Sequence, residues 1–98
     1  VLDAIQTAVN KQGRIRDLEQ RDRALNTERS TITQDQSRIR ENMDKVDRNS
    51  ELYGRWIQKL TEQETRLEQI EAERAALAEN IEVARKDFND YLANLTVE

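Results

Sequence analysis

Residues 46–53 of the chain read VDRNSELY. This stretch separates two blocks of heptad repeats whose apolar positions do not share a phase. The first block, if continued, would make Tyr53 a d position, whereas the second block uses Tyr53 as an a position. Asp47, Asn49 and Ser50 are residue types that favour turns and helix N-caps. The break in phase predicts either a tight reversal of the chain or a stammer in one continuous helix.

Apolar residues recur every seven positions on both sides of this stretch. The first block has d positions at Ala4, Lys11, Leu18, Leu25, Ile32, Ile39 and Val46, and a positions at Val1, Ala8, Ile15, Asp22, Arg29, Gln36 and Met43. The second block has a positions at Tyr53, Leu60, Leu67, Arg74, Ile81, Phe88 and Leu95, and d positions at Trp56, Gln63, Ile70, Leu77, Ala84 and Tyr91. Each block therefore predicts a helix with one apolar stripe, and the stripe is stronger in the second block.

The register of the two blocks favours the reversal. When the chain folds between Asn49 and Ser50, every a position of one helix meets a d position of the other. Gln36 then faces Gln63, so two polar side chains share one layer, and we expect them to hydrogen-bond each other. The sequence therefore predicts an all-α fold, an antiparallel two-helix coiled-coil hairpin.

We expect a single unit of 98 residues, with helices at about 2–46 and 52–95 and a turn at about 47–51. The chain lacks Pro, has two Gly and is 37% charged, which is typical of long helices. Such a chain buries a stripe and no thick core. Because the seam is half polar, dimerisation into a four-helix bundle is a further expectation. The chain begins at Val1, so we interpret it as a fragment of a larger protein.

Five polar residues belong to the predicted seam: Gln36, Gln63, Asp22, Arg29 and Arg74. Asp22 and Arg74 fall in adjacent layers, where we expect them to pair. Our hypothesis is that these residues control the register, because polar core groups cost stability but penalise wrong alignments. The alternative is a polar patch that a partner can reach.

Both ends of the predicted hairpin carry more apolar residues than one seam covers. These candidate interface residues are Leu52, Trp56 and Ile57 near the turn, and Leu2, Ile5, Val9 and Leu92 at the open end. Surplus apolar surface marks interfaces. We expect the open end to dock on the next domain of the parent protein, and the turn to meet a partner or a second copy. Extra packing where the helices fray is the alternative.

Several classes of function are disfavoured. The chain has no His and no Cys, so the commonest nucleophile–base pairs and zinc sites are missing. Its carboxylates lie on a solvated helix surface without a shielded cleft. We therefore expect no enzyme activity, no cofactor and no small-molecule substrate. The net charge of −4 disfavours nucleic acid, and no apolar run approaches the ~20 residues of a membrane span.

One motif resembles a known family. Residues 35–43 read DQSRIRENM and are followed by Leu60, Glu64 and Leu67. This stretch resembles the C-terminal helical coiled-coil region of bacterial mucoidy-inhibitor-A-like proteins of unknown function, which carry a similar Gln-x-Arg-Ile-Arg-x-Asn pattern before a turn. The resemblance covers roughly residues 15–95. It implies a helical insertion or tail beside a β-rich domain of a larger bacterial protein, and no activity.

The sequence thus favours a non-catalytic structural or protein–protein interaction module. Two alternatives stay open. One is a rod formed by two parallel helices from two chains, and the other is a regulatory helical arm of a larger enzyme.

Overall fold

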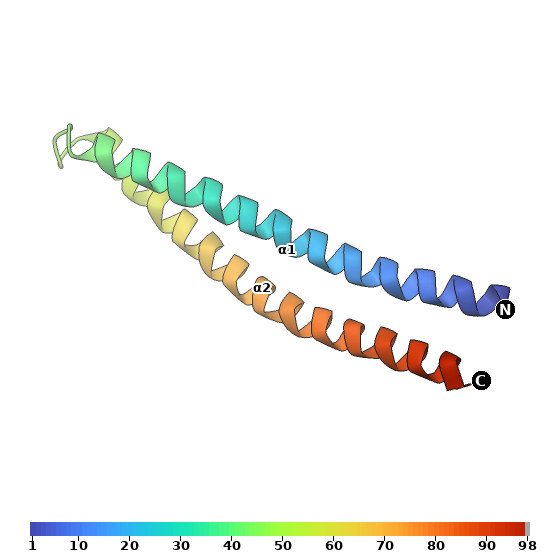
Figure 1. The fold of residues 1–98 in the computed structure, drawn as a ribbon. Coiled ribbons are helices and arrows are strands. Elements are labelled where there is room, and N and C mark those ends of the chain that lie inside the picture. Colours follow the sequence, from blue (N-terminus) through green and yellow to red (C-terminus); the bar gives the residue numbers. More distant parts are fainter. Residues whose placement is uncertain (98) are drawn as a thin grey trace. The chain divides into compact units, whose positions relative to one another are not determined.

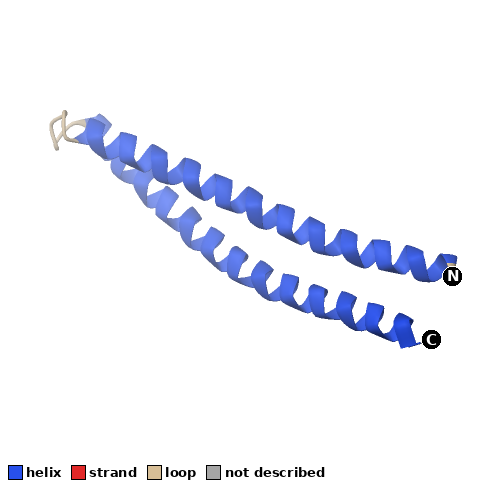
Figure 2. Cartoon of the chain, viewed as in Figure 1, coloured by secondary structure: helices blue, strands red, loops and turns tan. Residues whose placement is uncertain are grey.

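The computed structural model describes residues 1–97, with the side chains of residues 1–95. It contains two helices, α1 (Leu2–Met43) and α2 (Glu51–Val97), and no strand in the part that it describes (Figure 2). The prediction of an all-α helical hairpin is confirmed.

The chain divides into two compact units. The turn unit comprises Leu25–Glu73, and the terminal unit comprises Val1–Ala24 together with the residues from Arg74 onward. In the turn unit, residues 44–50 join the end of α1 to the start of α2, so this unit is a helical hairpin by itself (Figure 1). In the terminal unit, the first turns of α1 pair with the last turns of α2.

The end of α1 lies at Met43, whereas we expected helix to about residue 46. Asp44 N still donates to Arg40 O at 3.3 Å, but the two amides after it bond to carbonyls only three residues back. Lys45 N donates to Asn42 O at 3.1 Å and Val46 N donates to Met43 O at 3.3 Å. Such i→i−3 bonds tighten the last turn and replace the regular helical pattern. This geometry corrects the expected boundary.

The start of α2 is fixed by Ser50, which caps the helix. Its hydroxyl accepts a bond from Tyr53 N at 3.2 Å and donates to Asp47 O at 2.6 Å. The Asp47 carboxylate accepts a bond from Asn49 N at 2.9 Å. A serine that satisfies the amide three residues later is the preferred helix N-cap. Asp47 and Ser50 therefore explain why helix resumes at Glu51.

The fully buried apolar side chains follow the predicted heptad positions. In the turn unit, Ile39 and Ile70 are 0% exposed and Met43 is also buried. In the terminal unit, Leu18 is buried. Each such side chain contributes about 1.5–3 kcal/mol by leaving water. Three of these four buried side chains therefore belong to the turn unit.

Within the described residues, neither helix has a stretch that is both long and apolar enough to cross a lipid bilayer.

Candidate functional site

The two seam glutamines lie in the turn unit and bind neighbouring carboxylates. Gln36, only 4% exposed, donates through Nε2 to Glu64 Oε1 at 2.9 Å. Gln63 donates through Nε2 to Asp35 Oδ2 at 2.7 Å. The prediction that the two amides bond each other is therefore wrong. Each amide bonds a carboxylate instead, because bonds to charged acceptors are stronger than bonds between neutral amides. In the described part of the chain, Gln63 Oε1 is buried and lacks a hydrogen-bond partner.

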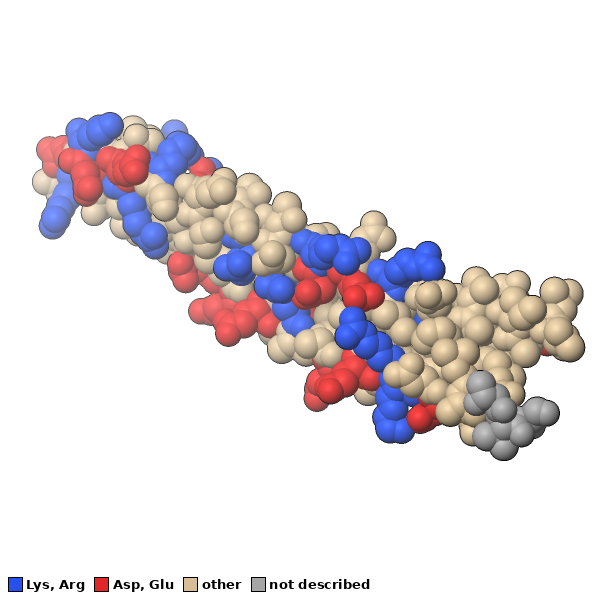
Figure 3. Space-filling model, in the orientation of Figure 1, with Lys and Arg blue, Asp and Glu red and all other residues tan. Residues whose placement is uncertain are grey.

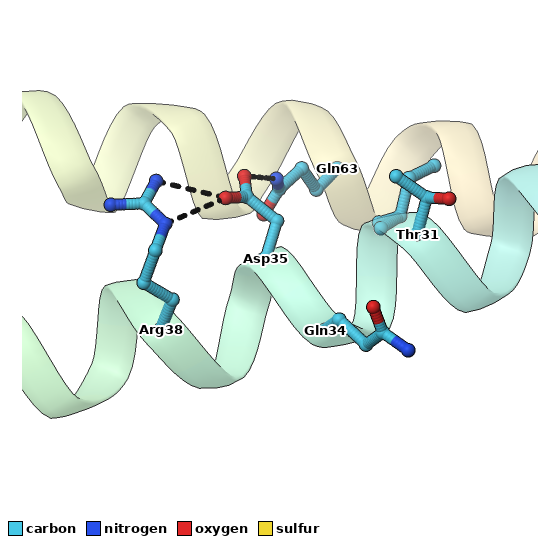
Figure 4. A pocket seen from close by; sticks show the side chains of 6 residues that line it. Thr31, Gln34, Asp35, Arg38 and Gln63 are labelled. Atoms are coloured by element: carbon cyan, nitrogen blue, oxygen red, sulfur yellow. Dashed lines mark hydrogen bonds and ion pairs between the residues drawn. The ribbon is translucent and has the colours of Figure 1, made fainter.

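Asp35 is the centre of this polar layer (Figure 4). Arg38 donates to its Oδ1 through Nε at 3.0 Å and Nη2 at 2.8 Å. Lys59 Nζ lies 3.3 Å from the other carboxylate oxygen, which also accepts from Gln63. These donors, Arg38 foremost, hold the pKa of Asp35 below its usual value. Arg38 of α1 and Lys59 and Gln63 of α2 thus meet at one ionised carboxylate.

A shallow hollow of about 380 Å³ lies beside this carboxylate. Thr31, Asp35, Arg38 and Gln63 contribute to its lining. In Figure 4 the Gln34 side chain points away from Asp35. The polar groups that line the hollow are already bonded to one another in part, so the hollow is best explained as the surface of the register layer.

An arginine on α2 lies between two carboxylates in the turn unit. Arg66 donates to Glu28 through Nε at 2.6 Å and Nη2 at 2.7 Å, and its Nη1 lies 3.7 Å from Glu73. The guanidinium lowers the pKa of Glu28, while Glu28 raises the pKa of Arg66. Two acidic residues on opposite helices are therefore held by a single fork of donors.

The expected pair of Asp22 with Arg74 is present in the terminal unit. Arg74 Nε donates to Asp22 Oδ1 at 2.8 Å, and this bond is the main reason that the pKa of Asp22 is lowered. Arg29 departs from its expected place in the seam. Its side chain is exposed and donates to Asn26 Oδ1 on the same helix at 3.0 Å. A long side chain can carry its charge out of an a position into water.

Further contacts in the terminal unit were not predicted from the sequence. Lys11 Nζ lies 2.5 Å from Asp87 Oδ2 and 5.4 Å from the centre of the Tyr91 ring. The Tyr91 hydroxyl donates to Ala4 O at 3.2 Å. The sequence feature that could have predicted these contacts is Lys11 at a d position. A lysine there must reach past the seam to an anion or an aromatic face.

The candidate interface residues of the turn unit are partly exposed. Leu52 and Ile57 are exposed, whereas Trp56 is half-buried. These residues lie in the first turns of α2. Single exposed apolar side chains occur on most proteins, so the exposure of Leu52 and Ile57 does not by itself mark an interface.

The candidate interface residues of the terminal unit surround an apolar groove. We call this the terminal groove; it has a volume of about 310 Å³ and no charged side chain in its lining. Its main contributors are Ile5, Ala8 and Val9 of α1 and Phe88, Leu92 and Leu95 of α2. Leu2 belongs to the same helix surface as Ile5 and Val9 and is exposed. The structure therefore brings Ile5, Val9 and Leu92 together, as expected for the open end.

The charge distribution of the terminal unit agrees with an uncharged end. In the view of Figure 3, the surface over the first turns of α1 is largely free of charged atoms, while Lys, Arg, Asp and Glu alternate farther along the helices. Among the described side chains, those of residues 1–95, no group of three or more acidic, His or Cys residues is placed to hold a metal ion.

No family model matches the chain, and no curated protein or solved structure matches it either.

Proposed function

We propose that this chain is a non-catalytic protein–protein interaction module, an antiparallel helical coiled coil whose terminal groove docks a protein surface. The observation that carries the proposal is the groove itself. Ile5 is 57% exposed and Val9 is 55% exposed, and both face an uncharged hollow between two helices. Clustered apolar side chains of this kind typically lie at interfaces.

Antiparallel pairing is supported by the order of the contacts within each unit. In the terminal unit, Lys11 contacts Asp87 and Glu19 contacts Arg85. In the turn unit, residue numbers also rise along α1 as they fall along α2, from Glu28–Arg66 to Gln36–Glu64. A parallel rod would need helix across residues 44–50, and it draws no support from helix ends at Met43 and Glu51.

A non-catalytic role is supported by the state of the carboxylates. Bonds from arginines lower the pKa of Asp22, Glu28 and Asp35. General acid–base catalysis near neutral pH uses carboxylates whose pKa is raised toward the working pH. These three groups are shifted in the opposite direction and act as fixed anions between the helices.

Site-specific photo-crosslinking in the native host tests the proposal. A photoreactive amino acid replaces Val9 in the groove or, as the matched control, Val83, which is 68% exposed and lies outside the groove lining. We expect a protein adduct from position 9 and none from position 83. Equal yields at the two positions, or no adduct at either, would contradict a docking role for the groove.

A further inference from the structure

The terminal groove needs an apolar occupant that spans both of its walls. Ile5 and Val9 form one wall on α1, and Leu92 and Leu95 form the other on α2. All four side chains are more than a third exposed, including Leu95, which occupies a seam position. An occupant that contacts only one helix would leave the other wall exposed to water. A second copy of this chain presents apolar side chains from two adjacent helices and can therefore cover both walls.

The surface beyond the groove carries charges of opposite sign on the two helices. Arg16 and Arg23 follow Val9 by one and two heptads, so they share its face of α1, and both are exposed. Glu82 lies one heptad before Asn89, beside Leu92 on α2, and is also exposed. The surface next to the groove is thus positive on α1 and negative on α2.

One ion pair within the chain leaves this contrast intact. Arg85 Nη2 donates to Glu19 Oε2 at 2.9 Å, so these two charges on the same surface neutralise each other. Arg16 and Glu82 form no ion pair with each other or with another side chain among the contacts of the described residues. Both charges can therefore meet a partner.

From these observations we infer that the terminal groove is covered by a second copy of this chain, with α1 of each copy lying on α2 of the other. A two-fold axis along the helices brings Arg16 opposite the partner's Glu82, and it brings the wall with Ile5 and Val9 against the wall with Leu92. The opposite choice, α1 on α1, would set Arg16 and Arg23 against like charges. This inference rests on the proposed docking role of the groove and names its partner.

Sedimentation equilibrium of the purified chain measures this association. We expect the unaltered chain to dimerise. Ile5→Lys and Leu92→Lys should each weaken the dimer by more than roughly 100-fold, because each places two lysines in an apolar contact. Val83→Lys, the matched control outside the groove, should change the association constant by less than about twofold. All three positions are exposed in one chain, so circular dichroism should show unchanged helix content.

Charge exchange tests the orientation. Arg16→Glu and Glu82→Arg should each lower the association constant by roughly three- to tenfold at low salt, and the double variant R16E/E82R should restore it. The chain has no cysteine, so mixed Val9→Cys and Asn89→Cys chains offer a second readout. The predicted orientation gives disulfides between the two different variants in preference to disulfides between identical ones.

Three results would overturn the inference: a monomer at every concentration, a dimer indifferent to Ile5→Lys and Leu92→Lys, or disulfides mainly between two Val9→Cys chains. A monomer that still gives an adduct with another protein from position 9 in the host would overturn only the second copy as occupant. The absence of any adduct from position 9 would instead overturn the docking role of the groove.

Discussion

The turn unit and the terminal unit follow the same heptad rule and have different surfaces. The seam of the turn unit contains large side chains such as Ile39 and Ile70, and both are fully buried. The seam of the terminal unit also contains large residues, Leu18 among them, but near the start of α1 the seam holds Ala4 and Ala8 while Ile5 and Val9 lie beside it. The position of the large apolar side chains therefore decides how much apolar surface is buried. Large side chains in the seam are buried between the helices, whereas large side chains beside the seam stay exposed and line a groove.

Two isoleucines provide the largest test of this comparison. Ile39→Ala should lower the free energy of unfolding by about 2–5 kcal/mol, because it removes a fully buried side chain from the turn unit. Ile5→Ala should cost less than about 1 kcal/mol at concentrations where the chain is monomeric, since Ile5 is already half in water. Chemical denaturation monitored by circular dichroism measures both. Similar losses at the two sites would show that the units do not differ in this way.

The seam glutamines offer a second test, of the polar layer in the turn unit. Gln63→Leu should raise the free energy of unfolding by about 1 kcal/mol, because it removes a buried oxygen that lacks a partner, while Asp35 keeps Arg38 and Lys59. Gln36→Leu, the matched control, should raise the free energy of unfolding by less, because it gives up the bond to Glu64.

The double variant with leucine at both positions should melt at a higher temperature and populate more than one oligomeric state in sedimentation, because polar seam residues select the register. A lower melting temperature for Gln63→Leu would speak against an unpaired amide oxygen. An unchanged single species for the double variant would remove the argument for register control.

Each unit has one glycine on a helix, and replacing it by alanine tests the outer surface of that unit. A Cβ added at Gly13 in the terminal unit or at Gly54 in the turn unit would meet no atom within 4 Å. Both are helical, so Gly13→Ala and Gly54→Ala should each raise the free energy of unfolding by about 0.5–1 kcal/mol. Thermal melts of dilute protein measure the gain. A loss at either site would reveal a close approach that the outer surface does not show.

The ion pairs predict the smallest effect, a loss of stability in acid. The folded pKa values of Glu28 and Asp22 lie below their usual values of 4.5 and 3.8. The contribution of these two ion pairs to the free energy of unfolding is therefore fully present above these values. It is lost as the pH falls through the lowered values of the folded chain. Arg66→Gln should reduce the acid loss that Glu28 causes in the turn unit, and Arg74→Gln should do the same for Asp22 in the terminal unit.

Titration of the melting temperature from pH 6 to about pH 2 measures these losses. Added salt should reduce them, because the paired groups are partly exposed and screened. A stability that rises toward acid would contradict the direction of the pKa shifts.

The backbone was largely predictable, because it follows from periodicity. Leu18, Ile39, Met43 and Ile70 are buried at positions where the heptads placed them. The helix boundary at Met43 was harder to predict, because the short-range bonds of Lys45 and Val46 compete with the helical pattern on nearly equal terms. Periodicity specifies the face of a helix and says little about its last turn.

The polar contacts were only partly predictable. Asp22 with Arg74 was expected, because both occupy the seam. The partners of Gln36 and Gln63 were not, since flexible carboxylates one position away compete with the opposite amide. Register fixes which backbone positions face each other, whereas side-chain length and charge choose the partner. The terminal groove was foreseen only as surplus apolar surface, and its shape needed the packed helices.

The most direct test of the account is a distance measured by pulsed electron spin resonance between spin labels at positions 8 and 91 of one chain. Dilution with unlabelled chain removes signals between copies. We expect a short distance, below about 20 Å, because Ala8 and Tyr91 are both seam positions of the terminal unit. A distance on the order of 120 Å, that of one straight helix through both positions, would contradict it.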